Sequence, residues 1–122
     1  QSTHKALETL QRCRDLEGGR ALAVVGDMKE LGDLSERAHI EVGRMVGELG
    51  LDGLITVGDA MGAAAEVARQ AGVSSVTAVE DADEALAWVR RFAEAGDWVL
   101  VKGSRSMRLE RVVDALRSDR RS

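Results

Sequence analysis

The residues best suited to chemistry lie in short polar turns, and the last of these turns is the most pronounced. Lys102 ends a branched apolar run, Gly103 permits a tight bend, and Ser104 and Arg105 follow. We expect Ser104 to begin a helix, whose free main-chain N–H groups and positive dipole end favour an anion. The turn therefore predicts a site for a carboxylate or a phosphate. The alternative is that Ser104 only caps the helix and that both cations are solvated.

An earlier turn carries acidic side chains. Asp27 and Glu30 follow a short apolar run and have the oxygen atoms needed to position a cation, a metal-bound water or an amine. The alternative is that these acids cap the next helix or pair with Lys29. His39 is a further candidate, although a single histidine on a helix is more often part of the core or of the surface than of a site.

Several motifs that would supply catalytic machinery are absent from the sequence. It contains neither the phosphate-binding loop G-x-x-x-x-G-K-[ST] nor G-x-G-x-x-G after the first apolar run. No Ser/His/Asp or Cys/His set is persuasive, and no cluster has the spacing of metal ligands. We therefore expect no catalytic residue and no metal site in this chain, which has the residues of a binding surface.

Composition excludes two classes of partner. The 122 residues carry a formal net charge of −4, with acids and bases interspersed, and only 2% are aromatic. This composition argues against a protein that binds nucleic acid by neutralising phosphates or stacking bases. No apolar stretch approaches the roughly 20 residues that span a membrane. The single cysteine, Cys13, cannot form an internal disulfide, which favours a reducing compartment, by default the cytoplasm.

Apolar periodicity predicts the elements that position these turns. Branched apolar runs predict strands over 21–25, 54–57, 98–101 and, more weakly, 75–79. Helical spacing predicts helices over 3–16, 36–49, 60–71, 82–95 and 105–116, with Asp81 and Glu84 forming a capping box. Strands that alternate with helices imply parallel pairing. We expect one domain over 1–122, a Rossmann-like three-layer α/β sandwich whose mainly parallel sheet is flanked by helices.

The fold class also places the polar turns together. In an open parallel sheet, ligands bind at the carboxyl ends of the strands. The turns after 21–25, 54–57 and 98–101 should therefore lie on one rim. Folds of this class usually begin with a strand, whereas this sequence opens on a helix. The first strand of the fold should thus be missing, and we expect self-association through the open sheet edge.

Two separated motifs of the sequence can be interpreted together. The first is Ala23 to Gly32, followed by Ser35, His39, Val42 and Gly43. The second is Val99 to Met107, followed by Glu110, Val112 and Val113, and Ile55 to Gly58 lies between them. In this order and spacing the motifs resemble the C-terminal domain of the Mur ligase family, closest to its D-alanyl-D-alanine-adding branch. The sequence departs from the family at Leu109, where methionine is expected, and by lacking the segment Asp-x-x-Tyr-Asn-Ala-Asn-Pro ahead of Gln1.

This resemblance implies an ATP-dependent carboxylate-amine ligase of peptidoglycan precursor synthesis. Such an enzyme joins D-Ala-D-Ala to UDP-N-acetylmuramoyl-tripeptide, and its other domains hold the nucleotide, ATP and Mg²⁺. Within such an enzyme, the chemistry of the turns leads to the hypothesis that Lys102, Ser104 and Arg105 hold the dipeptide carboxylate or a phosphate, while Asp27 and Glu30 orient the ammonium group. The isolated domain is expected to be inactive and to bind neither ATP nor Mg²⁺.

Two other classes of function remain open at this point. A free-standing, non-catalytic anion-binding or receiver-like regulatory module would place Asp27, Asp59 and Lys102 at comparable strand ends. A receiver usually carries adjacent acids at one strand end, which this sequence lacks. A purely structural oligomerisation domain would explain the helices but would leave the polar turns without a role.

Overall fold

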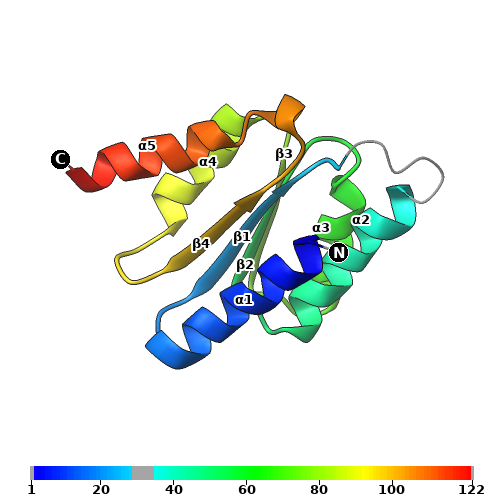
Figure 1. The fold of residues 1–122 in the computed structure, drawn as a ribbon. Coiled ribbons are helices and arrows are strands. Elements are labelled where there is room, and N and C mark those ends of the chain that lie inside the picture. Colours follow the sequence, from blue (N-terminus) through cyan, green and yellow to red (C-terminus); the bar gives the residue numbers. More distant parts are fainter. Residues whose placement is uncertain (1, 29–34, 122) are drawn as a thin grey trace.

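The structure is a computed structural model that describes residues 2–28 and 35–121. Helices and strands alternate along the described chain (Figure 1). The helices are α1 (Ser2–Glu17), α2 (Ser35–Glu48), α3 (Gly62–Gln70), α4 (Ala82–Phe92) and α5 (Glu110–Arg121). The strands are β1 (Ala21–Gly26), β2 (Gly53–Val57), β3 (Ser75–Val79) and β4 (Trp98–Lys102).

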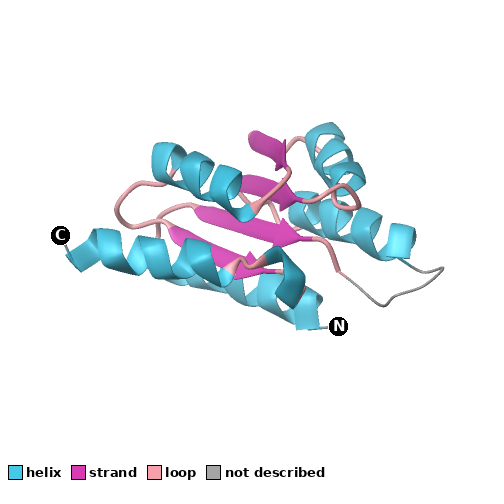
Figure 2. Ribbon diagram, turned by 90° about the horizontal axis from the view of Figure 1, so that it is seen from above, coloured by secondary structure: helices cyan, strands magenta, loops and turns pink. Residues whose placement is uncertain are grey.

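The four strands form one parallel sheet in the order β3-β2-β1-β4. Helices α1, α2 and α3 cover one face, and α4 and α5 cover the other (Figure 2). The sequence of β1, Ala-Leu-Ala-Val-Val-Gly, is buried along its whole length because the strand is central and covered on both faces. The predicted class, a three-layer α/β sandwich, is confirmed.

Glycines let α2 and α3 approach closely on their shared face. A Cβ atom on Gly43 would lie 2.3 Å from the main-chain oxygen of Ala64, and one on Gly47 would lie 2.4 Å from the Cβ atom of Ala71. Close helix contact of this kind requires glycine on one side of the crossing. The close contact between α2 and α3 fixes the first turns of α3 and, through them, the end of β2.

The ends of α1, α2 and α3 lie within two residues of the prediction, whereas α4 ends at Phe92 instead of residue 95 and α5 runs to Arg121 instead of residue 116. The difference that matters for function is the start of α5. The predicted cap of α4 at Asp81 is confirmed, because the amide of Glu84 donates to the Asp81 carboxylate at 2.9 Å. The Glu84 carboxylate accepts in return from the amide of Glu80 at 2.7 Å, one residue before the cap. The last helix was expected from Arg105, and that expectation is wrong. Residues Arg105–Met107 form a single 3-10 turn, and α5 begins only at Glu110. The break lies at Arg108, whose main chain is left-handed, with φ 55° and ψ 37°.

The outer edge of β4 has no strand partner within the described residues. Its first residue, Trp98, is half-buried, and its indole N–H donates to the main-chain oxygen of Gly18 at 3.1 Å. None of the described helices is both long enough and apolar enough to cross a membrane.

Candidate functional site

The turns that follow β1, β2 and β4 lie together at the carboxyl edge of the sheet, as the sequence predicted. In the sheet register Val25 pairs with both Thr56 and Lys102, so the three strands end at the same level. The amide of Ser104 donates to the main-chain oxygen of Asp27 at 3.1 Å. The acidic and the basic turn are therefore direct neighbours.

Asp27 links three of these strand ends. Its amide donates to the main-chain oxygen of Val57 at 2.9 Å, and its carboxylate Oδ1 accepts from the amide of Met61 at 2.9 Å. Gly58 lies directly against the carboxylate, with a φ of +104°. One oxygen of Asp27 is thus used to hold the start of α3, a role that the sequence did not reveal.

The basic turn differs in one respect from its prediction. Ser104 makes no side-chain capping bond, and its hydroxyl lies 3.2 Å from that of Ser106. Since α5 starts later, its dipole does not act at Ser104. Among the described residues, however, the amides of Arg105 and Ser106 have no hydrogen-bond partner. Lys102 is half-buried and Arg105 is exposed, so two cations and two open amides still meet there.

Charge changes sign along this edge of the sheet. Across the sheet, Glu80 and Asp81 follow β3, and Asp59 lies after β2. Asp27 follows β1, while Lys102 ends β4 and Arg105 lies beyond it. The acids lie at one end of the row and the bases at the other. A small molecule with a positive and a negative end matches this order, because each end meets the opposite charge.

His39, a further predicted residue, does not add a group to this row. His39 is only 1% exposed, and its Nε2 accepts from the amide of Met28 at 3.1 Å. It therefore belongs to the core beneath the first turn and not to the open surface. Glu30 lies outside the described residues. No group of three or more metal-ligating side chains occurs in the described chain.

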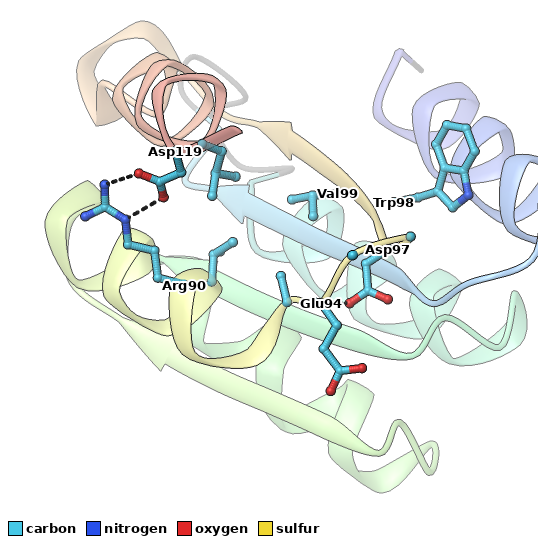
Figure 3. Close-up of a pocket in the computed structure, with 11 residues that line it drawn as sticks. Arg90, Glu94, Asp97, Trp98, Val99 and Asp119 are labelled. Atoms are coloured by element: carbon cyan, nitrogen blue, oxygen red, sulfur yellow. Dashed lines mark hydrogen bonds and ion pairs between the residues drawn. The ribbon is translucent and has the colours of Figure 1, made fainter. Parts of the chain in front are cut away.

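A pocket of about 690 Å³ lies at the opposite end of the sheet, between α4, α5 and the start of β4 (Figure 3). Its apolar walls include Val99 and Leu116. The charged groups at its border are already paired: Arg90 forms an ion pair with Asp119, and Asp97 forms one with Arg20. A charged ligand in this pocket would meet charges that already have partners, which favours the carboxyl edge as the functional site.

The pair of Arg20 and Asp97 stabilises the connection that leads into β4. The Asp97 carboxylate is only 5% exposed and accepts from Arg20 at 2.8 Å and from the amide of Glu94 at 2.8 Å. Burial raises the pKa of Asp97, but the hydrogen bonds from Arg20 and Glu94 outweigh it, so the pKa lies below its ordinary value.

The chain was compared with known families, sequences and structures. Residues 1–105 match the family described as "Mur ligase, glutamate ligase domain". The UDP-N-acetylmuramoyl-tripeptide–D-alanyl-D-alanine ligase of Bacillus subtilis is 38% identical over 112 residues, which cover 88% of this chain and 24% of that enzyme. The ligase of the same name from Escherichia coli is 34% identical and covers 90% of this chain and 24% of that enzyme.

Solved structures give the same result. A crystal structure of MurF from Acinetobacter baumannii superposes with a TM-score of 0.74 at 28% identity, covering 93% of this chain and 25% of that one. MurF from Thermotoga maritima, solved in complex with ADP, gives a TM-score of 0.68 at 27% identity, covering 98% of this chain and 27% of that one. The chain spans about a quarter of these relatives. It belongs to the Mur ligase family, in which it corresponds to the glutamate ligase domain.

Proposed function

We propose that this chain is the C-terminal domain of an ATP-dependent ligase that adds D-Ala-D-Ala to UDP-N-acetylmuramoyl-tripeptide in peptidoglycan precursor synthesis. The relatives named above carry that activity in their names, and one neighbour was solved with ADP. The observation that carries the proposal is the row of charges along the carboxyl edge, which suits a zwitterionic dipeptide. We place the enzyme in the cytoplasm, where ATP and nucleotide-linked precursors are found.

In this proposal the basic turn holds the carboxylate of the dipeptide. Lys102 and Arg105 supply positive charge, and Ser104 and the open amides of residues 105 and 106 supply hydrogen-bond donors. Asp27 orients the ammonium end with the carboxylate oxygen that Met61 does not use, and Glu30 assists it. Holding the amine in place raises its effective concentration for attack on an activated tripeptide carboxyl group.

ATP and Mg²⁺ are assigned to other domains of the full-length enzyme. The sequence has no phosphate-binding loop, and the described residues contain no cluster of metal-ligating side chains. We therefore expect the isolated chain to hydrolyse no ATP, to form no amide bond and to give no ATP binding heat in calorimetry. A measurable heat would place part of the ATP site in this domain.

We propose that a strand preceding α1 in the full-length enzyme pairs with the outer edge of β4. Helix α1 lies on the same face as α2 and α3, whose crossovers step from β1 toward β3. Connections between parallel strands are right-handed, so a connection through α1, on this same face, must also cross the sheet in the direction from β4 toward β3. A strand ahead of α1 that leads into β1 would therefore lie on the β4 side of β1. Since β4 already occupies the place beside β1, that strand would pair with the outer edge of β4.

A receiver-like module is the less favoured alternative. In that module Asp27 would be the acid at the first strand end, Asp59 the phospho-acceptor and Lys102 the later lysine. A receiver usually carries adjacent acids at one strand end, whereas Asp27 is followed by Met28, and Oδ1 of Asp27 already accepts from the amide of Met61.

The proposal is tested by Lys102→Ala and Arg105→Ala in the full-length ligase. Loss of one charge-assisted hydrogen bond should raise the KM for D-Ala-D-Ala about tenfold. The KM for ATP should stay within about twofold, because ATP binds elsewhere. Arg117→Ala removes an exposed cation from α5 and serves as the matched control. An unchanged dipeptide KM in both variants would remove the role assigned to the basic turn.

A further inference from the structure

We infer that Leu109 is a positioning residue for the basic turn: it holds Arg105 and the open amides, which follow the end of β4, at a fixed place relative to β1. This inference rests on the proposed function, because it concerns the same dipeptide carboxylate. Leu109 lies outside the turn and carries no polar side-chain atom, so it acts only through the groups it packs against.

The side chain of Leu109 occupies a notch formed by two glycines from separate turns. A Cβ atom on Gly26 would lie 2.9 Å from Cδ1 of Leu109, and one on Gly103 would lie 2.8 Å from the same atom. Leu109 is only 4% exposed. Its methyl group thus fills the space that side chains at positions 26 and 103 would need, and it joins the end of β1 to the bend after β4.

The left-handed residue Arg108 directs Leu109 into this notch. The amide of Met107 donates to the oxygen of Ser104 at 3.0 Å, and that of Arg108 donates to the oxygen of Arg105 at 3.1 Å. These bonds close the segment into a tight turn, after which the left-handed conformation reverses the direction of the chain. This conformation is unfavourable for a residue with a side chain, and burial of Leu109 offsets its cost.

Several contacts join the basic turn to β1 within the described structure. Lys102 pairs with Val25 in the sheet, the Ser104 amide donates to the Asp27 oxygen, and Met107 packs against the Gly26 position. Leu109 lies against both Gly26 and Gly103, so it supports the bend at which the turn leaves β4. If the side chain of Leu109 is shortened, the bend at Gly103 loses this support. The turn then samples other positions, and the dipeptide carboxylate binds more weakly although no charged group has been removed.

The test uses Leu109→Ala, Leu109→Val and Leu109→Met in the full-length ligase. We expect Leu109→Ala to raise the KM for D-Ala-D-Ala about fivefold or more, and the KM for ATP to change less than about twofold. Leu109→Val should have a smaller effect in the same direction. Leu109→Met should restore the wild-type KM, because the flexible methionine side chain can still fill the notch.

The matched control is Val112→Ala, which shortens a fully buried side chain of α5 that is not among the nearest atoms of either glycine. It reports the effect of a cavity in the same core. Hydrogen exchange of the segment 102–106 gives a readout that does not depend on activity: it should become faster in Leu109→Ala but not in Val112→Ala. The inference is wrong if the Leu109 variants and Val112→Ala agree in dipeptide KM and in exchange.

The same measurements separate failure of this inference from failure of the proposed function. If Lys102→Ala and Arg105→Ala leave the dipeptide KM unchanged, the basic turn does not bind the dipeptide and both fail. If those variants raise the KM while the Leu109 variants match Val112→Ala, the function stands and only the role of Leu109 is lost.

Discussion

The carboxylate of Asp27 occupies the space that a side chain on Gly58 would need. A Cβ atom on Gly58 would lie 2.4 Å from Cγ of Asp27, and the φ of Gly58 is +104°. The residue after β2 therefore has to be glycine for two reasons, its backbone conformation and the neighbouring carboxylate. Because Asp27 also binds the amide of Met61, a disturbance at Gly58 reaches the start of α3.

Gly58→Ala should lower the free energy of unfolding by about 2 kcal/mol, since alanine is strained at this φ and displaces Asp27. Urea denaturation measures the effect. Gly62→Ala is the control, because no atom lies within 4 Å of its Cβ position and it stands in α3. That change should be neutral or stabilising by roughly 0.5 kcal/mol. Equal stability of the two variants would contradict this geometry.

Thr56→Val should stabilise the chain. The hydroxyl of Thr56 is fully buried, and it has no hydrogen-bond partner within the described residues. Valine has almost the same shape and carries no group to desolvate, so we expect a gain of about 1 kcal/mol in thermal or urea unfolding. Thr56→Ser keeps the hydroxyl, loses the methyl group and should be destabilising. A loss of stability in the valine variant would mean that the hydroxyl is bound after all.

Asp97→Asn should destabilise the chain in a pH-dependent way. The lowered pKa of Asp97 means that its ionised form is stabilised by folding, so this stability is complete above the ordinary pKa and is lost as the pH falls through the lower, folded-state pKa. Loss of the charge-assisted hydrogen bonds should cost about 2 kcal/mol at neutral pH. The difference from wild type should shrink below about pH 4. Unfolding curves at pH 7 and pH 3 measure it, and a constant difference would be inconsistent with this assignment.

The isolated chain should self-associate through β4. Its outer edge has no partner among the described residues, and free main-chain groups at a sheet edge pair with other strands. Light scattering over a dilution series should show an average mass that rises with concentration. A constant monomer mass over the whole series would mean that the edge is protected.

Periodicity and turn residues were sufficient to predict the layers and the shared edge of this fold. Buried runs such as Ala21–Val25 need no tertiary information, and parallel pairing follows from the alternation of strands and helices. The start of α5 was not predictable in this way, because no glycine or proline marks the break at Arg108. Its left-handed backbone depends on where Leu109 packs, and that contact joins residues from three separate segments.

The site was predictable to a similar extent. The sequence indicated that Asp27 and Lys102 would share an edge, since both follow strands of one parallel sheet. It did not indicate that Asp27 would bind the amide of Met61, 34 residues later, or that Gly58 would make room for the carboxylate. Such contacts depend on how close neighbouring strand ends lie in the folded sheet. The spacing of residues along one segment of sequence does not give that distance.

The position of Trp98 gives this domain an intrinsic fluorescent reporter. Its indole lies at the first residue of β4, close to the unpaired edge, and donates to Gly18. Addition of a strand there would remove water from around the ring and shift its emission to shorter wavelength. Trp88, on α4 at the other side of the sheet, also fluoresces, so a Trp88→Phe variant would isolate the signal of Trp98 without any attached dye.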